Sequence, residues 1–223
     1  MTVEEYFRDW AHAIDKKTLN TTIAYLNKLY SIKDITPEYK DIFKAFTLCE
    51  RKDCKVVFIG QDVYPQKGIA TGIAFGNKAH TKQLSPSLEV LKDAVLNFKD
   101  PYRPAEFDIT LEDWGKQGIL LINSALTCEV NKIGSHLSLW RPFITEFLVK
   151  LSSINPGLIY VLFGKQAQSF DSYINKQFNT IIKINHPSYY ARINKPMPSD
   201  VFKRINELLK GKNGEVINWF KYI

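Results

Sequence analysis

Several features that mark common enzyme classes are absent from this chain of 223 residues. It has no glycine-rich loop of the G-x-x-x-x-G-K-[ST] or G-x-G-x-x-G type, which argues against an enzyme that uses nucleoside triphosphates or dinucleotides. It also has no serine nucleophile elbow, no internal repeat and no low-complexity segment. Any catalysis must therefore depend on side chains outside a phosphate-binding loop or a serine nucleophile elbow.

Cysteine and long apolar runs are also scarce. The three cysteines, Cys49, Cys54 and Cys128, are odd in number and form no C-x-x-C pair, so neither a disulfide framework nor a metal cluster is expected. No apolar run approaches the ~20 residues that span a bilayer, and the first residues, MTVEEYF, lack the basic and apolar segments of a secretory signal. We therefore expect a soluble protein in the cytoplasm of a bacterium or a host cell, with no metal, no cofactor and no membrane partner.

Hydrophobic and basic side chains, in contrast, are abundant. Hydrophobic residues make up 45% of the chain and aromatic residues 13%, which argues against disorder and favours one domain, residues 1–223, with a substantial core. The net charge of +7 favours an anionic partner, because lysines and arginines that neutralise phosphates release counterions. Many basic proteins bind no nucleic acid, so the charge alone does not identify that partner.

The hydrophobic pattern predicts strands that alternate with helices. Short runs rich in β-branched residues predict four buried strands, at 56–59, 119–122, 158–163 and 180–184. Helical spacing predicts helices at 3–13 and 19–30, from Thr36 and Pro37 onward, from Pro86 onward, at 143–151, and at 201–210 with Gly211 as the cap. The alternation is typical of a single α/β domain, with a central, four-stranded, mainly parallel twisted sheet flanked by helices. Residues 1–50 are expected to form a helical part that packs on the sheet.

Each predicted strand is followed by residues that suit a binding or catalytic site. These residues are Gln61 and Asp62 after the first strand, Asn123 after the second, Gly164 and Lys165 after the third, and His186 after the fourth. Ligands of open α/β sheets bind beyond the carboxyl ends of the strands, so these residues are expected to converge there. A carboxylate and an imidazole in one site suit heterolysis of a glycosidic bond, in which opposite charges develop on the two fragments.

Several motifs resemble, in order, those of the family 1 uracil-DNA glycosylases. GQDVYP (60–65) resembles the family's water-activating motif, GIAFG (72–76) its uracil-stacking segment, and SPSL (85–88) its DNA-compressing loop. WGKQGILLINSALT (114–127) resembles the asparagine-bearing strand, and HPSYYAR (186–192) the intercalation loop. SH at 135–136, NELL at 206–209 and INW at 217–219 also fall in the family's order. The resemblance spans nearly the whole chain and implies a monofunctional glycosylase that flips uracil out of DNA, hydrolyses its N-glycosidic bond and leaves an abasic site for base excision repair.

The resemblance implies a role for each residue that follows the strands. Asp62, ionised, would orient or activate the attacking water and stabilise the cationic sugar, and neutral His186 would donate a hydrogen bond to uracil O2. Asn123 would bind uracil O4 and N3–H, a pattern that cytosine cannot satisfy because its donor and acceptor are reversed. No metal enters this scheme.

Three further residues would shape the pocket for the base. Tyr64 would lie against uracil C5, where the methyl group of thymine would clash, and against the sugar, where a 2′-OH would not fit. Gln61 would contact the base through its backbone. Phe75 would stack on the base, although an aromatic residue at this place is also consistent with plain core.

The resemblance further implies a set of DNA contacts: Ser85, Pro86, Ser87, Gly164, Lys165, Ser188, Tyr189, Tyr190 and Arg192. The sequence departs from the family here, since Val63, Pro65 and Lys165 replace the usual Pro, His and Ser, and Tyr189 and Tyr190 replace Pro and the intercalating Leu. Lys165 would add a phosphate contact, and Tyr190 would stack on neighbouring bases. These differences concern binding to DNA rather than the chemistry.

Two other functions are compatible with the same fold. One is a non-catalytic or weakly catalytic DNA-binding or replication-accessory subunit, which would not need Asp62, Asn123 or His186. The other is a glycosylase for a different lesion, which Asn123 and Tyr64 together disfavour. We expect a monomer that acts on uracil-containing DNA, either single- or double-stranded. We also expect that inhibitor proteins that mimic DNA bind to it.

Overall fold

A sheet of four parallel strands forms the centre of the computed structural model, which describes residues 2–223. The strands are β2 (Val56–Asp62), β4 (Ile119–Ala125), β6 (Ile159–Phe163) and β7 (Thr180–Ile184), in the spatial order β4-β2-β6-β7. Each neighbouring pair is parallel, and Phe58 of β2 lies between Leu121 of β4 and Val161 of β6. The predicted fold class, an α/β domain with a four-stranded parallel sheet, is therefore confirmed.

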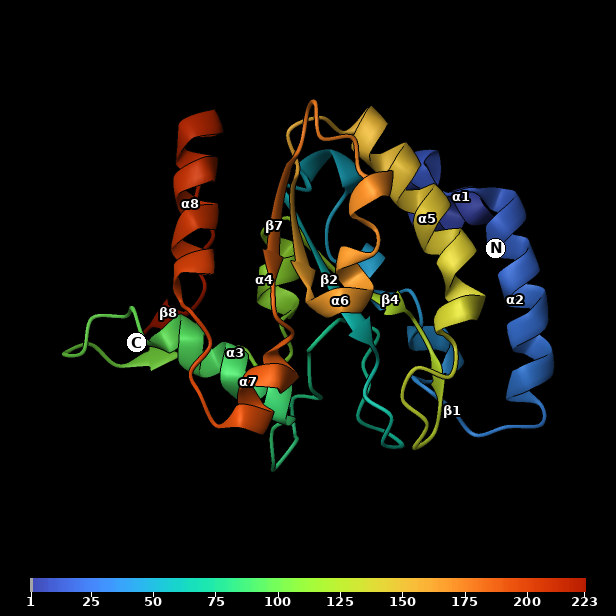
Figure 1. Ribbon diagram of the computed structural model, residues 1–223, viewed down its shortest axis with the longest axis horizontal. Coiled ribbons are helices and arrows are strands. Elements are labelled where there is room, and N and C mark those ends of the chain that lie inside the picture. Colours follow the sequence, from blue (N-terminus) through green and yellow to red (C-terminus); the bar gives the residue numbers. More distant parts are fainter. Residues whose placement is uncertain (1) are drawn as a thin grey trace.

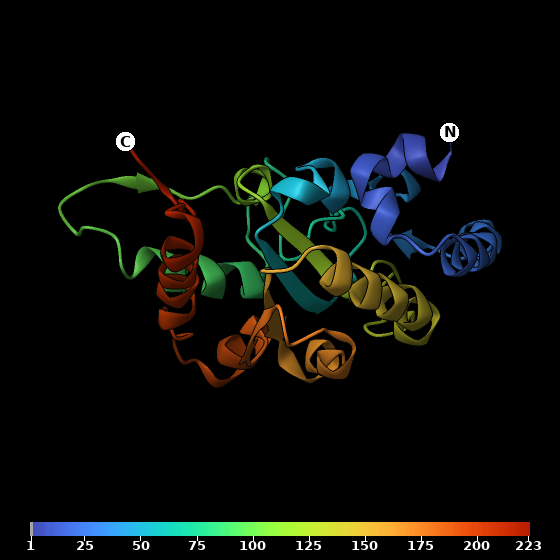
Figure 2. The same ribbon diagram turned by 90° about the horizontal axis from the view of Figure 1, so that it is seen from above.

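Helices cover both faces of this sheet (Figures 1 and 2). α2 (Lys16–Tyr30) and α5 (Leu137–Ile154) lie on one side, and α3 (Pro86–Leu96) and α8 (Asp200–Asn213) lie on the other. Successive residues of β2 point to opposite faces. Val57 and Ile59 pack in the core that includes α5, whereas Val56 and Phe58 pack in the core that includes α8. Burial on both faces explains why β2 begins as an unbroken apolar run.

The N-terminal part adds an aromatic layer to the core on the α5 side. Phe7 and Trp10 are buried there, and Trp10 donates its indole N–H to the carbonyl of Cys49 at 2.8 Å. The helix expected at 3–13 is in fact α1 (Val3–Phe7) followed by a 3₁₀ helix, η1 (Arg8–Ala13). The α-helix ends because Arg8 adopts a positive φ of 49°.

The α-helix expected from Thr36 and Pro37 does not form, and that prediction was wrong. Thr36 belongs to β1 (Ile35–Thr36), which pairs antiparallel with β5 (Cys128–Glu129). Its extended backbone therefore takes part in β-sheet pairing and does not begin an α-helix. Three 3₁₀ helices follow, η2 (Tyr39–Asp41), η3 (Lys44–Thr47) and η4 (Arg51–Asp53). The apolar spacing identified buried side chains, but short 3₁₀ turns bury them as well as an α-helix does.

Two strands and one helix extend beyond their predicted ends. β2 and β4 continue to Asp62 and Ala125, so the polar residues expected after the strands lie on their last rungs. α8 ends at Gly214, which has the left-handed φ of 75° typical of a C-cap, while Gly211 lies inside the helix. The cap expected at Gly211 was therefore misplaced.

The remaining elements are short. They are α4 (Glu112–Lys116), α6 (Gly164–Gln168), α7 (Pro187–Ile193), η5 (Asp171–Tyr173), β3 (Ala105–Glu106) and β8 (Lys221–Tyr222). β3 and β8 pair antiparallel, which places the C-terminal segment beside the loop before β3. Among residues 2–223, none of the helices has the length and apolar character needed to span a bilayer.

Candidate active site

A small pocket lies where the strands of the central sheet end. Its walls come from β2, β4, the loop after β2, the start of α3 and the start of α7. The lining includes six of the residues predicted from the sequence: Asp62, Tyr64, Phe75, Ser87, Asn123 and His186. Gln61 is half-buried beside Asp62 on β2 and is not part of this lining. The predicted convergence of an acid, an amide and an imidazole at one edge is thus present.

Asn123 is buried in the floor of the pocket, with 5% of its surface exposed. It pairs across the sheet with Gly60, and a Cβ at Gly60 would collide with the amide oxygen of Asn123. Glycine is therefore needed on β2 for this side chain to fit. Among residues 2–223, no group forms a hydrogen bond with the Asn123 amide. The amide lines the pocket, where a ligand with one donor and one acceptor would pair with it.

Phe75 forms an aromatic wall of the same pocket. Its backbone adopts a left-handed φ of 67°, and its carbonyl accepts a hydrogen bond from the Tyr64 hydroxyl at 2.8 Å. Its ring packs edge-on against Phe163, with 5.1 Å between the centroids. The two aromatic residues Tyr64 and Phe75 are therefore held to each other and to the core, before any ligand binds.

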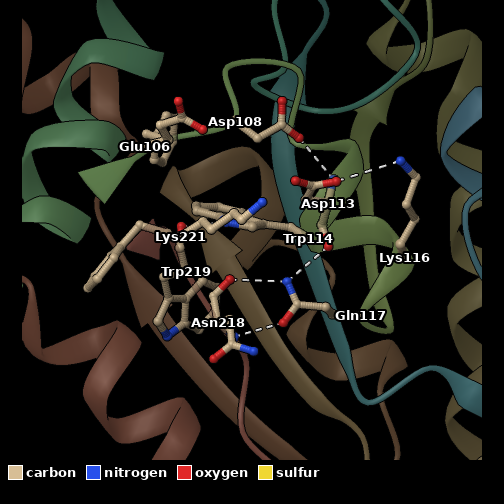
Figure 3. A pocket seen from close by; sticks show the side chains of 11 residues that line it. Glu106, Asp108, Asp113, Trp114, Lys116, Gln117, Asn218, Trp219 and Lys221 are labelled. Atoms are coloured by element: carbon tan, nitrogen blue, oxygen red, sulfur yellow. Dashed lines mark hydrogen bonds and ion pairs between the residues drawn. The ribbon is translucent and has the colours of Figure 1, made fainter. Parts of the chain in front are cut away.

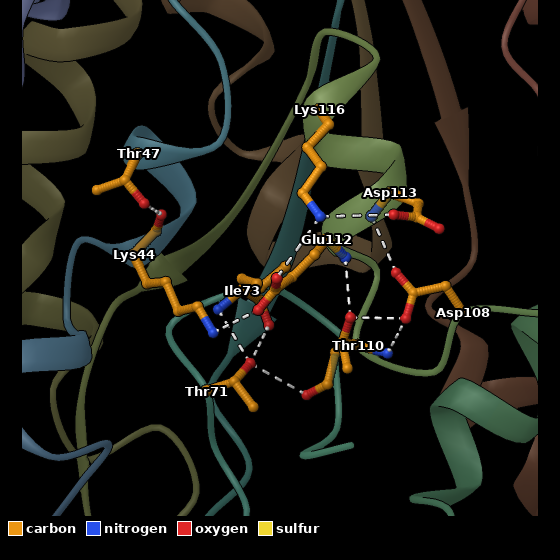
Figure 4. A network of polar contacts seen from close by, with 10 residues as sticks. Lys44, Thr47, Thr71, Ile73, Asp108, Thr110, Glu112, Asp113 and Lys116 are labelled. Carbon is orange, nitrogen blue, oxygen red and sulfur yellow. Dashed lines mark hydrogen bonds and ion pairs between the residues drawn. The ribbon is translucent and has the colours of Figure 1, made fainter.

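A polar network supports this wall from behind (Figure 4). The Thr71 hydroxyl accepts from the backbone N–H of Ile73 at 3.3 Å and lies 3.4 Å from the carbonyl of Gly76. Lys44 of η3 and Glu112 of α4 form an ion pair at 2.6 Å beside the same turn. The turn that carries Phe75 is thus braced by side chains from two elements that are distant in the sequence.

His186 is the N-cap residue of α7 and is held in one tautomer. Its Nδ1 atom accepts from the backbone N–H of Ser188 at 3.2 Å and lies 2.8 Å from the Ser188 hydroxyl. Because a backbone N–H can only donate, Nδ1 carries no proton and the neutral ring keeps its proton on Nε2. Burial lowers the pKa of His186 to about 4, so the ring is neutral at pH 7.

Asp62 is the acid of the pocket. Burial raises the pKa of its carboxyl group, and a hydrogen bond from the backbone N–H of Gly134 to Oδ2, at 2.5 Å, acts in the opposite direction. No lysine or arginine lines the pocket within the described chain. The site therefore combines one carboxylate, one neutral imidazole that offers an N–H, and one unpaired amide.

Known proteins resemble this chain in sequence and in fold. A sequence profile of the Uracil DNA glycosylase superfamily matches residues 46–210. A uracil-DNA glycosylase of Mesomycoplasma hyopneumoniae is 34% identical over 199 residues, which cover 87% of this chain and 87% of that protein. This chain belongs to the uracil-DNA glycosylase superfamily. A uracil-DNA glycosylase of Campylobacter jejuni is 36% identical over 196 residues, covering 87% of this chain and 83% of the relative.

Solved structures share the superfamily fold with this chain. The crystal structure of the mimivirus UNG variant Y322L, in complex with UGI, superimposes with a TM-score of 0.81 at 24% sequence identity. The match covers 98% of this chain and 88% of the mimivirus chain. At this identity the likeness concerns the fold, and it includes the N-terminal part that precedes the profile match.

The segments for which the superfamily resemblance predicts DNA contacts begin three helices around the pocket. Ser85 is at the N-cap position of α3 but its hydroxyl bonds Asn77, Pro86 is the first residue of the helix, and Ser87 lines the pocket. Gly164 and the exposed Lys165 begin α6, and a Cβ at Gly164 would come within 2.9 Å of the His186 Cβ. The segments expected as a turn and a loop are thus the first turns of helices.

The remaining predicted DNA contacts lie on α7, next to the strand ends (Figure 1). Ser188 and Arg192 are exposed, and the Arg192 guanidinium lies 5.8 Å from the centre of the Tyr189 ring. Tyr189 is 38% exposed, whereas Tyr190 is half-buried and packs against the core on the α3 side. The residue at the intercalating position therefore faces the protein more than its neighbour does.

A hollow larger than this pocket lies away from the predicted site residues (Figure 3). It runs between α4 and the C-terminal segment, where Gln117 donates to the carbonyl of Asn218 at 3.1 Å and accepts from its N–H at 2.8 Å. Gln117 and Asn218 thus satisfy each other and Trp114 donates to the carbonyl of Trp219, whereas the buried indole N–H of Trp219 has no partner among residues 2–223. Size alone would therefore have pointed to this hollow and not to the pocket that brings Asp62, Asn123 and His186 together.

Some residues that shape this pocket had no role predicted from the sequence. Thr71, Lys44 and Glu112 brace the Phe75 turn, and nothing in their local pattern predicted that they would meet. Gly134 donates to Asp62, and the only signal was the adjacent SH pair at 135–136, which matched the family's order. Such contacts depend on the tertiary fold and not on sequence spacing.

Proposed function

We propose that this member of the superfamily excises uracil from DNA by turning the base out of the stack into the pocket, and that it leaves an abasic site. The family assignment supports the reaction class, hydrolysis of an N-glycosyl bond in DNA repair. The observation that carries the specific proposal is the buried, unpaired amide of Asn123, in one pocket with Asp62 and His186. Unstacking the base costs a few kcal/mol, which DNA contacts and pocket contacts must offset.

Asn123 recognises the base in this proposal. Its Nδ2 donates to uracil O4, and its Oδ1 accepts from uracil N3–H. Cytosine presents a donor and an acceptor in the opposite order, so both polar groups would remain unpaired in a buried place. Such a mismatch allows discrimination of ~10,000-fold.

His186 stabilises the leaving base. As the bond between C1′ and N1 breaks, the bonding electrons move to uracil and negative charge develops on O2. The Nε2–H of the neutral imidazole, whose Nδ1 is held by Ser188, donates a hydrogen bond to this oxygen. Loss of one such donor typically costs ~100- to 1,000-fold in rate.

Asp62 acts on the other fragment. Its carboxylate stabilises the positive charge that develops on the sugar, and it orients a water molecule for attack on C1′. Burial raises the pKa of Asp62. Within residues 2–223 the carboxylate accepts one hydrogen bond, from the backbone N–H of Gly134, and forms no ion pair, so it remains available to water and the sugar. The oxygen of water becomes the 1′-hydroxyl of the abasic sugar.

The aromatic residues and Gln61 select the base by shape. Phe75 stacks on uracil, and Tyr64 lies against C5, where a methyl group would clash. The hydrogen bond from Tyr64 to the Phe75 carbonyl supports this proposal, because it fixes the spacing between the two rings. Gln61, beside Asp62, contributes through its backbone.

The helix starts around the pocket bind the DNA in this proposal. Ser85, Pro86 and Ser87 on α3, Gly164 and Lys165 on α6, and Ser188, Tyr189, Tyr190 and Arg192 on α7 contact the strand that carries uracil. The net charge of +7 supports an anionic partner. We further propose that the chain acts as a monomer, on single- or double-stranded DNA, and that inhibitor proteins that mimic DNA compete for the same surface.

An excision assay tests this proposal. Wild type, Asp62→Asn and His186→Ala are incubated in EDTA with an end-labelled oligonucleotide that contains one uracil, and abasic sites are cleaved with alkali. We expect a cleavage band from wild type that is lost or at least ~100-fold weaker with both variants. A wild type that binds DNA but yields no band would overturn the proposal and favour a DNA-binding accessory subunit.

A further inference from the structure

The loop at 127–136, between β4 and α5, contains the SH pair for which the proposed function has no role. We call it the Asp62 loop, because the backbone N–H of Gly134 donates to Oδ2 of Asp62 at 2.5 Å. Within residues 2–223 this is the only hydrogen bond to that carboxylate. The direction in which Asp62 points therefore depends on the position of one backbone N–H group.

Side chains close the Asp62 loop at its base. His136 is 3% exposed, and its Nδ1 lies 2.8 Å from the hydroxyl of Thr127. The indole N–H of Trp140 donates to the same hydroxyl at 2.7 Å. Because Thr127 already accepts from Trp140, its own proton is free for His136 Nδ1, and the two ends of the loop are joined.

A second set of hydrogen bonds closes the Asp62 loop nearer to its middle. The Ser135 hydroxyl accepts from the backbone N–H of Glu129 at 2.9 Å, and the backbone N–H of Lys132 donates to the carbonyl of Glu129 at 3.0 Å. Lys132 also forms an ion pair with the Glu129 carboxylate at 2.7 Å. Both halves of the SH pair therefore serve to close the loop that carries Gly134.

The Asp62 loop is also attached to its surroundings. The backbone N–H of Asn131 donates to the carbonyl of Pro65 at 2.9 Å, so the loop binds the chain after Asp62 as well as Asp62 itself. On the other side, Val130 donates to the carbonyl of Asp34 at 2.8 Å, beside the β1–β5 pair. The loop thus connects the N-terminal part of the chain to the candidate acid.

The conformation of Gly134 fixes where its N–H points. Its φ of 78° is in the left-handed region, which other residues adopt only with strain. A Cβ at this position would lie 3.3 Å from Cδ1 of Leu137, a contact that requires only a small shift. A substitution here should therefore move the N–H without preventing folding.

We propose that Gly134, Ser135 and His136 are positioning residues that orient the Asp62 carboxylate through the Gly134 N–H. This inference rests on the proposed excision of uracil, and it separates two tasks within the pocket. The loop aligns the acid with the water and the sugar, while Asn123 and Phe75 bind the base. Displacing a reacting group by about 1 Å can cost ~100-fold in rate.

The sign of the pH effect follows from the charge of Asp62. The Gly134 N–H stabilises the ionised carboxylate and so lowers its pKa, and burial raises that pKa. The other titratable groups that face the carboxylate are the Cys128 thiol on β5 and Tyr64 and His186 in the pocket. Loss of the N–H raises the pKa of Asp62, and the acid limb of the pH–rate profile moves to higher pH.

Two matched pairs of variants test the proposal. Gly134→Ala is compared with Gly157→Ala, since Gly157 also has a left-handed φ, 92°, but meets nothing within 4 Å and lies before β6, at the opposite edge of the sheet. We expect Gly134→Ala to lower kcat ~10- to 100-fold, shift the acid limb upward and leave inhibition by free uracil within about twofold, while Gly157→Ala retains wild-type kcat. In the second pair, Ser135→Ala lowers kcat by about 3- to 10-fold, and Ser135→Thr, which keeps the hydroxyl, restores it.

Equal kcat values for the two glycine variants, or a Gly134→Ala enzyme with weaker uracil binding and unchanged kcat, would overturn the inference. A wild type without excision would instead overturn the proposed function. In that case the chemical shift of the Gly134 amide proton, measured by NMR as a function of pH, still tests its hydrogen bond to Asp62. It should titrate with Asp62 in wild type and lose that titration in Asp62→Asn, and an amide that titrates identically in both refutes the contact.

Discussion

The pocket and the helix starts around it differ in how much of their arrangement the protein itself fixes. In the pocket, Asn123 and Phe75 are each 5% exposed, and Tyr64 is bonded to the Phe75 carbonyl. On α7, in contrast, Tyr189 and Ile193 are each 38% exposed, and Arg192 forms no ion pair with a carboxylate among residues 2–223. The residues proposed to recognise the base are therefore held by the fold itself, whereas those proposed to bind DNA are exposed side chains. Substitutions in the two regions should therefore have different consequences.

The largest effect is expected for Asn123→Ala. It removes the amide that we propose binds uracil and should lower kcat/KM by ~100- to 1,000-fold or more, while no hydrogen bond within residues 2–223 is lost and the melting temperature stays the same or rises. The matched control is Asn179→Ala, because Asn179 is also buried but its amide bonds Leu158, Ser152 and Asn175. That control should lose about 1–3 kcal/mol of stability and keep its activity, as measured by thermal unfolding and excision rates. If Asn123→Ala instead unfolds and Asn179→Ala does not, the amide has a structural role.

The next effect concerns pH. The pKa of Asp62 is raised in the folded state, so kcat should fall by up to about tenfold per pH unit as the pH drops through that value. Stability should show the opposite sign, since an acid whose pKa is raised by folding opposes folding once it is ionised. Asp62→Asn should therefore melt at a higher temperature than wild type at pH 7, and the difference should shrink at acid pH. A difference that does not depend on pH would contradict this assignment.

A smaller effect is expected on α7. Tyr190→Ala should slow excision from duplex DNA about tenfold more than excision from single-stranded DNA, because only the duplex has a gap to fill after the base leaves. Tyr189→Ala provides the comparison, since Tyr189 is the more exposed of the pair. Excision rates on matched single- and double-stranded oligonucleotides measure both. Equal effects of Tyr190→Ala on the two substrates would remove its role as a wedge.

The smallest effect is expected for Lys165→Ser, which restores the residue that the family resemblance leads us to expect. Removing one phosphate contact should reduce the slope of log K against log salt concentration by about 1 and leave kcat unchanged. Binding to a labelled duplex at several salt concentrations measures this slope. A lower kcat with an unchanged slope would show that Lys165 affects the chemical step and does not contact a phosphate.

The sequence predicted the central sheet well because β2, β4 and β6 are buried along most of their length, while the edge strand β7 is only partly buried but rich in isoleucine. β6 and β7 were located to within one residue, and Asp62, Asn123 and His186 from three strand ends meet in one pocket, which Gly164 and Lys165 after β6 do not line. The helix at Thr36 failed because antiparallel pairing with Cys128 overrides the local signal of a Thr-Pro pair. Local propensity is a weak guide where a tertiary ladder competes for the same backbone.

The candidate site was predicted to the level of its principal residues, but not of their supports. Asp62, Asn123 and His186 were identified from motifs, while the Gly134 hydrogen bond and the Lys44–Glu112 ion pair join segments 72 and 68 residues apart. No periodicity connects positions at such separations. The half-buried position of Tyr190 could likewise not be predicted from the sequence, because it depends on how α7 packs against α3.

The most direct test of the account identifies the base that is released. Wild type and Asn123→Ala are incubated with duplexes that contain a single uracil, thymine or cytosine at one position, and the free bases are measured by mass spectrometry. The account predicts that wild type releases uracil alone and that Asn123→Ala releases at least ~100-fold less. Release of thymine or cytosine by wild type at a rate similar to uracil, or no release of any base, would contradict the claim that the buried Asn123 amide is the recognition element of a uracil-excising pocket.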